Sequence, residues 1–301
     1  MQRMNKNSIL AAVRNGRILV SDGAWGTFLQ QKGLRPGDCP ELWCVERRAE
    51  VLDVARRYLN AGADMIESNS FGASRFKLAH FGLADRAAEI NEAAARISRE
   101  AAGPDGWVIA SVGPTGKMLI TGEATEAEIY AAFKEQAMAL ARGGADAVCI
   151  ETMTAADEAA LAVRAARENT DCEVICTFTF QLGSNGRYHT MMGLAPTQAA
   201  GEAIQAGAHI VGANCGNGME QMIDIIREMR TAAGDTPLLV HANAGLPKNV
   251  NGVEVFPETA EEMAGRVGAL IEAGASIVGG CCGTTPAHIA AIRHAVDARS
   301  P

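Results

Sequence analysis

Three of the eight cysteines stand in positions from which their thiols can bind a metal ion. Cys281 and Cys282 are adjacent in GGCCG, after the apolar run ASIV, and Cys215 stands in GANCG after a similar run. Three thiolates suit a tetrahedral zinc ion and leave one position open, which is the arrangement of catalytic rather than structural zinc sites. Asn243 follows an apolar segment that lies between them in sequence, and its amide oxygen is a candidate for a weak fourth ligand.

Spacing alone leaves three interpretations of these thiols: a zinc site, a packed end of the fold beside glycine, or a catalytic thiol. A helix start follows each segment, at Met219 and at Thr285-Pro286, and a helix N-terminus favours the thiolate form of a nearby cysteine. The CxxC spacing of zinc fingers and redox motifs is absent. The remaining cysteines are expected to fill core or loop positions: Cys39, Cys44, Cys149, Cys172 and Cys176.

The elements that position these residues follow a repeated pattern. Four times a helical stretch ends in a small-residue turn and an apolar run of five to six residues follows, with Gly62, Gly144, Gly207 and Gly274 at the turns. Such glycines are typical of the left-handed residue just past a helix C-terminus. The apolar runs are typical of parallel strands that are covered on both faces. Four further strands are predicted within 17–23, 107–113, 173–180 and 237–245.

Eight strands that alternate with amphipathic helices predict one (β/α)₈ TIM barrel over residues 1–301, an α/β fold of a single domain. A doubly wound open sheet usually has fewer strands. Barrel enzymes carry their chemistry at the carboxyl ends of the strands. Polar residues and glycines gather at these ends, with Asp22 and Gly23 after the first strand, Ser111 after the third and Glu151 after the fourth. The zinc candidates end strands six, seven and eight.

Composition limits the class of protein. The formal net charge is −8, from 35 acidic and 27 basic residues, which argues against binding to nucleic acid or to an anionic membrane. No apolar stretch reaches the 18 residues of a membrane span, and residues 1–16 lack the apolar run of a signal peptide. We therefore expect a cytoplasmic protein, in which cysteines serve as ligands, nucleophiles or core more often than as disulfides. The sequence leaves a homo-oligomer open.

The motifs around these residues resemble the homocysteine S-methyltransferase family, and most closely the homocysteine-binding module of cobalamin-dependent methionine synthases. The resemblance runs in order along nearly the whole chain, and the CCG pair with an upstream GxNC is its most specific part. The motifs are DGAWGTFLQ (22–30), ESNSFGAS (67–74), SVGPTG (111–116), IET (150–152), GANCG (212–216), NAGLP (243–247) and GGCCGTTPAHIAAI (279–292).

The resemblance implies zinc-dependent transfer of a methyl group to the sulfur of homocysteine, which forms methionine. It assigns Zn²⁺ to Cys215, Cys281 and Cys282, with Asn243 as a fourth ligand that the substrate thiol displaces. It also assigns the amino-acid end of homocysteine to Asp22, Gly23 and Glu151, with Ser111 as a weaker candidate. Zinc would promote deprotonation of the substrate thiol, and the thiolate is the nucleophile. Two structural alternatives remain for the carboxylates: Asp22 as a helix cap, and Glu151 paired with an arginine of the barrel.

The methyl donor is less defined than the acceptor. Thr152 stands where betaine-using relatives place a zinc-binding tyrosine, which argues against betaine. No Asp-x-His-x-x-Gly run for a corrinoid is present, so we expect methylcobalamin to be free or carried by a partner protein. S-methylmethionine as donor, another acceptor thiol in a corrinoid methyl shuttle, and a non-catalytic homocysteine sensor are the alternatives. Trp25 stands where methionine is common in methionine synthases. We expect it either to pack in the core or to line the approach of the donor. His241 is expected to be a core histidine.

Overall fold

Eight parallel strands form the inner wall of the protein in the computed structural model, which describes residues 8–250 and 253–299. Their hydrogen-bonded order is β1-β12-β9-β8-β5-β4-β3-β2, and every neighbouring pair is parallel. The strands are β1 (Leu19–Val20), β2 (Met65–Glu67), β3 (Trp107–Val112), β4 (Ala147–Met153), β5 (Glu173–Phe178), β8 (Ile210–Asn214), β9 (Leu238–Ala242) and β12 (Ala275–Gly280). The predicted (β/α)₈ barrel is confirmed. Its predicted limits, residues 1 and 301, and part of the segment 1–16 lie outside the described residues.

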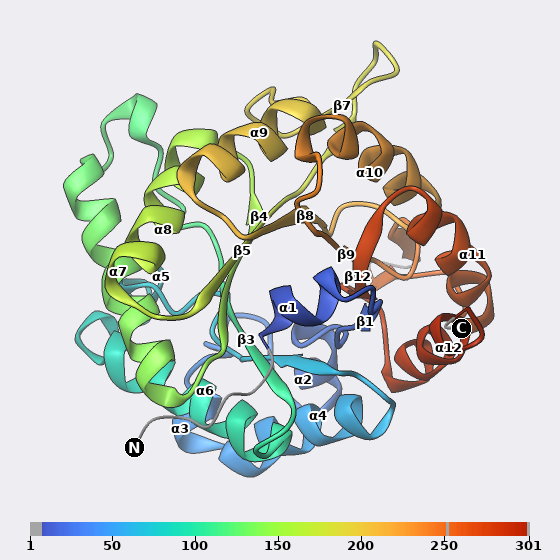
Figure 1. Ribbon diagram of the computed structural model, residues 1–301. Coiled ribbons are helices and arrows are strands. Elements are labelled where there is room, and N and C mark those ends of the chain that lie inside the picture. The colour runs from blue at the N-terminus through green and yellow to red at the C-terminus, as the bar shows by residue number, and fades with distance from the viewer. Residues whose placement is uncertain (1–7, 251–252, 300–301) are drawn as a thin grey trace.

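A ring of helices surrounds these strands (Figure 1). The ring comprises α4 (Arg48–Asn60), α6 (Ala87–Ala102), α7 (Glu126–Gly143), α8 (Ala156–Asn169), α9 (Pro196–Ala206), α10 (Met219–Ala233), α11 (Ala260–Glu272) and α12 (Pro286–Asp297). Shorter helices are α1 (Ile9–Arg14), α2 (Gly26–Gln31), α3 (Trp43–Glu46), α5 (Arg75–Ala79), and the 3₁₀ turns η1 (Ala84–Arg86) and η2 (Leu119–Thr121). None of the helices that the structure describes is long and apolar enough to cross a bilayer.

The ends of the helices follow the signals in the sequence. The four turn glycines all have positive φ, at 99° for Gly62, 108° for Gly144, 105° for Gly207 and 115° for Gly274. They reverse the chain from a helix into the following strand, as predicted. Capping boxes begin α7, with Thr125 and Glu128, and α11, with Thr259 and Glu262.

Apolar side chains fill the amino-terminal half of the barrel. They belong to one buried cluster that includes Leu19, Met65, Ile109, Cys149, Ile175, Ile210, Leu239 and Ile277. Helix α1 covers this end, because Ile9 and Ala12 join the same cluster (Figure 1). The Leu10 N–H donates to the Glu173 carboxylate at 3.2 Å, which ties α1 to β5. The amino-terminal end of the barrel is therefore closed, and an interior site must open at the carboxyl ends of the strands.

Two aspartates bridge β1 and β2, which are not neighbours in the strand ladder. At the amino end, the Asp64 N–H donates to the Val20 carbonyl at 2.7 Å and the Val20 N–H donates to the Asp64 carboxylate at 2.8 Å. At the carboxyl end, the Glu67 N–H donates to Oδ2 of Asp22 at 3.0 Å. Strand β1 spans only two residues although the apolar pattern predicts a strand within 17–23, and backbone bonds to β12 continue beyond it at Ser21 and Asp22. The carboxylates of Asp64 and Asp22 thus provide some of the hydrogen bonds that close the barrel between β1 and β2.

Two antiparallel hairpins lie in loops beyond the barrel strands and were not predicted. One joins β6 (Gln181–Leu182) to β7 (Tyr188–His189), and it projects beyond the helical ring (Figure 1). The other joins β10 (Lys248–Val250) to β11 (Val253–Val255). Strands this short carry too few residues for a period of two to stand out from loop sequence.

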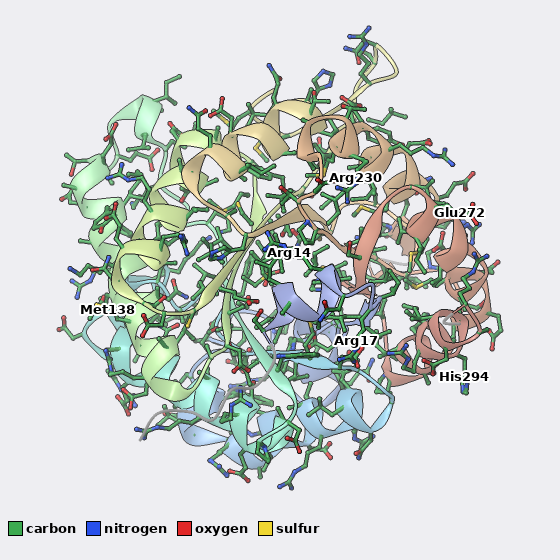
Figure 2. All side chains as sticks on the ribbon, viewed as in Figure 1. Arg14, Arg17, Met138, Arg230, Glu272 and His294 are labelled. Atoms are coloured by element: carbon green, nitrogen blue, oxygen red, sulfur yellow. The ribbon has the colours of Figure 1, made fainter. Side chains whose placement is uncertain are left out.

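The outer surface of the ring carries charged and polar side chains. Glu272 and His294 point outward from α11 and α12 in Figure 2. Arg230, also labelled there, donates to the carbonyls of Gly234, Thr236 and Gly274, which fastens the turns beside β9 and β12. The five cysteines expected to pack inside are all buried.

Candidate metal and amino-acid site

The three candidate thiols converge at the carboxyl ends of β8 and β12, on either side of β9. Their sulfur atoms all lie within 4.8 Å of one another, and Sγ of Cys215 is 3.9 Å from Sγ of Cys282. A tetrahedral zinc ion with Zn–S bonds of about 2.3 Å needs its sulfurs roughly 3.8 Å apart. The observed separations therefore suit one shared ion with little rearrangement.

Backbone hydrogen bonds to β9 fix the chain on both sides of this thiol group. The Cys215 N–H donates to the His241 carbonyl at 3.0 Å, and the Cys281 N–H donates to the Ala242 carbonyl at 2.7 Å. The Ala244 N–H in turn donates to the Cys282 carbonyl at 3.0 Å. Cys215 also has a φ of 59°, a left-handed conformation that is uncommon outside glycine. The fold imposes this conformation where the chain turns from β8 toward α10.

A close approach at Gly283 allows the two adjacent cysteines to face one centre. Gly283 has a φ of 80°, and a Cβ there would lie 2.3 Å from Phe256. Residues on a regular strand alternate in direction, so Cys281 and Cys282 would point to opposite sides if β12 continued. The strand instead ends at Gly280. Glycine thus permits the turn that redirects the second thiol.

Asn243 is the candidate for the remaining donor. Its side chain contributes to the lowered pKa of Cys215, and its Oδ1 is buried without a hydrogen-bond partner. Buried polar atoms are normally satisfied, so an orphaned amide oxygen beside three thiols indicates a ligand position. Three soft sulfur donors and one oxygen donor are a ligand set that suits zinc.

The ionisation of the thiols shows the same demand for a cation. Hydrogen bonds from Cys281 and Cys282 lower the pKa of Cys215 to about 3. Its negative charge and hydrogen bonding raise the pKa of Cys282 to about 12 and that of Cys281 well above its usual value. Cys281 and Cys282 therefore favour the protonated thiol when Cys215 is a thiolate. A bound cation reverses this preference, because coordination stabilises each thiolate.

A cavity of about 310 Å³ opens directly beside the thiol group. Its wall includes all three cysteines and also Gly23, Ser111 and Glu151, as expected from sequence. Gly23 allows two segments to approach closely here: a Cβ on it would lie 2.7 Å from Oγ1 of Thr284 and 2.9 Å from the ring of Tyr58. The volume is at the small end of ligand sites, which is appropriate for an amino acid.

Glu151 points into this cavity from β4. Ser111 donates to its Oε1, and Asn214 donates to its Oε2 at 3.2 Å, so the alternative pairing with an arginine is not what the structure shows. Asn214 also donates to Oγ1 of Thr152 at 2.7 Å and accepts from the Thr152 N–H at 2.7 Å. Burial raises the pKa of Glu151 to about 7. Asn214 directly precedes Cys215 in the chain, so the residue that donates to the Glu151 carboxylate is the neighbour of a candidate zinc ligand.

Asp22, unlike Gly23, Ser111 and Glu151, is not among the residues that line the cavity, and three hydrogen bonds hold its carboxylate. The indole N–H of Trp25 donates to Oδ2 at 2.8 Å, the Ser21 hydroxyl donates to Oδ1 at 3.1 Å, and the Glu67 N–H also donates to Oδ2. Burial raises the pKa of Asp22 to about 6. Asp22 is therefore not a helix cap. Trp25 is buried in the core, as one of its two expected roles required, and it also lines the cavity.

Glu67 and His241 also line the cavity, and the sequence did not single them out as site residues. Their nearest polar atoms, Oε1 and Nδ1, are 3.5 Å apart. Burial and the nearby carboxylates raise the pKa of Glu67 well above its usual value, and burial lowers the pKa of His241 to about 4. Glu67 stands in ESNSFGAS at the carboxyl end of β2, a position that is typical of site residues in a TIM barrel.

Residues 19–296 match the family model for homocysteine S-methyltransferases. The chain belongs to the homocysteine S-methyltransferase family. Two curated methionine synthases are similar to it. That of Mycobacterium tuberculosis is 34% identical over 95% of this chain, and that of Mycobacterium leprae is 33% identical over 93%. These alignments cover 25% and 24% of the two relatives, so the chain spans about a quarter of their length.

Solved structures of the homocysteine methyltransferase MmuM from Escherichia coli have the same fold as this chain. The metallated form matches with a TM-score of 0.77 and 24% identity, over 97% of this chain and 99% of that one. The oxidized form matches with a TM-score of 0.76 and 25% identity, over 98% of this chain and 100% of that one. The likeness extends over essentially the whole barrel.

The thiol group predicts the metal content of the purified protein. We expect about one zinc per chain, and Cys215→Ala, Cys281→Ala and Cys282→Ala should each lose most of it, because two thiolates and an amide bind zinc far more weakly than three thiolates. Cys39→Ala, which removes a buried thiol elsewhere, should keep it. Elemental analysis after dialysis measures this, and stoichiometric zinc in all three site variants would show that the metal binds elsewhere.

The buried carboxyl group of Glu67 predicts a pH-dependent stability. Since its folded-state pKa is raised, its ionisation disfavours the folded state as pH rises above the unfolded-state value of about 4.3. Without substrate, Glu67→Gln should raise the unfolding temperature at pH 8 by about 2–4 °C, equivalent to about 1 kcal/mol, and by less at pH 5. Glu202→Gln, on the exposed face of α9, is the control. Equal effects of Glu67→Gln at both pH values would contradict this account.

Proposed function

We propose that this chain transfers a methyl group to the thiol of homocysteine and forms methionine, with a methyl-corrinoid as donor. The observation that carries the proposal is the convergence of three thiols and an orphaned amide oxygen beside a cavity of amino-acid size. The methionine synthase relatives support methionine as the product, and the metallated form of the Escherichia coli enzyme supports a metal. We assign the metal as zinc, bound by Cys215, Cys281 and Cys282.

To activate the substrate sulfur, the protein would hold zinc through three soft sulfur ligands and leave the fourth position to a ligand that the substrate thiolate can displace. Zinc, when bound here, favours the thiolate form of a coordinated substrate thiol. Asn243 offers a neutral oxygen, a weaker partner for zinc than a thiolate, and is therefore the ligand that gives way. The displacement is balanced: the thiolate lone pair forms the new S–C bond, the donor keeps the electrons of its broken bond to methyl, and the thiol proton leaves to solvent.

The amino-acid end of homocysteine is proposed to lie against the buried carboxyl groups at the ends of the other strands. We assign the ammonium group to Glu151, which Ser111 and Asn214 orient, and to the buried negative charge of Asp22. The turn at Gly23 brings the backbone next to the cavity, where its N–H groups can meet the carboxylate. Holding both ends fixes the sulfur for an in-line displacement, which needs alignment more than acid–base chemistry.

The donor is proposed to arrive as free methylcobalamin or on a separate corrinoid protein. Exposed apolar side chains on loops at the carboxyl ends of the strands, including Phe71, Ile120, Met191 and Leu246, give the mouth of the barrel a surface that such a donor can contact. A betaine-type site is disfavoured, because Thr152 has no phenol and its hydroxyl already accepts from Asn214.

Methionine formation tests the proposal. The zinc-loaded chain is incubated with homocysteine and, separately, with methylcobalamin, S-methylmethionine or betaine, and methionine is quantified. We expect methionine from methylcobalamin and none from betaine, and Cys281→Ala should reduce the rate at least about 100-fold because the thiol is no longer activated.

Each other outcome identifies an alternative. Turnover from S-methylmethionine but not from methylcobalamin would contradict the corrinoid donor and support a small sulfonium donor. Homocysteine binding without methionine from any donor, including an added methyl-corrinoid protein, would contradict catalysis and support a sensor. Turnover with other thiols at equal rates would contradict homocysteine as the specific acceptor.

A further inference from the structure

Among the buried carboxyl groups of the barrel mouth, Asp22, Glu67 and Glu151 act on one another's charge and have no basic partner. Asp22, Glu67 and Glu151 are at most 7% exposed. Within the described part of the chain, neither lysine nor arginine forms an ion pair with any of the three. Buried carboxylates normally pair with a cation or take up a proton. The raised pKa values of these three groups favour the protonated forms in the absence of a cation, and a bound cation would favour the carboxylates instead.

Glu67 is the member of the group that lines the cavity and has an unpartnered carboxylate oxygen. Its backbone is fixed on two sides, because its N–H donates to Asp22 and its carbonyl accepts from the Ser98 hydroxyl at 2.7 Å. Its side chain lines the cavity, and the buried Oε1 accepts no hydrogen bond. Asp22, by contrast, already accepts three hydrogen bonds.

His241 does not supply the missing charge. Its Nδ1 lies 3.5 Å from Oε1 of Glu67 without satisfying that oxygen, and its Nε2 is buried and also has no partner. An imidazolium donates from both ring nitrogens, and here Nε2 has no acceptor. His241 therefore leaves Oε1 of Glu67 without a hydrogen bond.

Glu67 and Glu151 together form a receptor of the right size for a primary ammonium group. A ligand oxygen of each and a ring nitrogen of His241 lie within 4.8 Å of one another. The receptor is also close to the thiol group, because Asn214 donates to Glu151 and the next residue is Cys215. One small molecule with an amino group at one end and a thiol at the other can reach both.

We infer that Glu67 directly accepts the ammonium group of the substrate, beside Glu151, and so makes the site selective for amino thiols over thiols that lack the amino group. The inference rests on the proposed function and adds a binding residue that the family motifs did not assign. In this arrangement the ammonium group supplies the cation that the three carboxyl groups lack.

Calorimetry on the zinc-loaded full chain tests this with two ligands, L-homocysteine and 4-mercaptobutanoate, which has hydrogen in place of the amino group. Glu67→Gln keeps the shape of the side chain and removes its charge. We expect it to weaken homocysteine binding by about tenfold to a hundredfold, as for one charged hydrogen bond, and to change 4-mercaptobutanoate binding by less than about twofold.

Glu41→Gln is the matched control, since Glu41 is a buried carboxylate of the same cavity wall whose Oε1 already accepts from the Gly72 N–H at 2.7 Å. It should not discriminate between the two ligands.

Three results would overturn the inference: equal weakening of both ligands by Glu67→Gln, no weakening of either, or a second equivalent of zinc that this variant loses. Wild-type protein that binds 4-mercaptobutanoate as tightly as homocysteine would also contradict ammonium recognition. Wild-type protein that binds neither ligand would instead contradict the proposed function itself, and the inference with it.

Discussion

Strand β9 holds the site together through its hydrogen bonds to both neighbours. Its carbonyls at His241 and Ala242 accept the N–H groups of Cys215 and Cys281, which come from strands on opposite sides. These bonds place three thiols within 4.8 Å although about 65 residues separate Cys215 from the other two. Asn243 follows on the same chain, so the ladder that closes the barrel also sets the geometry of the proposed zinc ligands.

The second constraint is charge. Buried carboxyl groups and partly buried thiols surround one cavity, and within the described residues no lysine or arginine pairs with Asp22, Glu67 or Glu151. Burial raises the pKa of Asp22 to about 6 and that of Glu151 to about 7. Ionisation of these buried groups therefore destabilises the folded protein when no cation is bound at the mouth of the barrel. A metal at one end and an ammonium group at the other would relieve this destabilisation.

Sequence pattern predicted the barrel, because its elements depend on local signals, and it placed the three cysteines at strand ends, although spacing alone left their role open. Glycines after helices, short apolar runs and residues at strand ends all carry over directly into topology. The two-residue β1 and the bridging role of Asp22 could not be predicted, since they depend on side chains that face each other across β1 and β2. Glu67 was missed for a similar reason. An acid at a strand end looks the same in sequence whether its oxygen is satisfied or unpartnered.

Zinc X-ray absorption on the purified chain, with and without homocysteine, tests the central claim most directly. The account predicts three sulfur ligands at about 2.3 Å and one lighter ligand in the free protein, and four sulfurs once homocysteine is added. The increase would show that the substrate thiol replaces the weak fourth ligand. A spectrum with fewer than three sulfurs, or one that homocysteine leaves unchanged, would contradict the account.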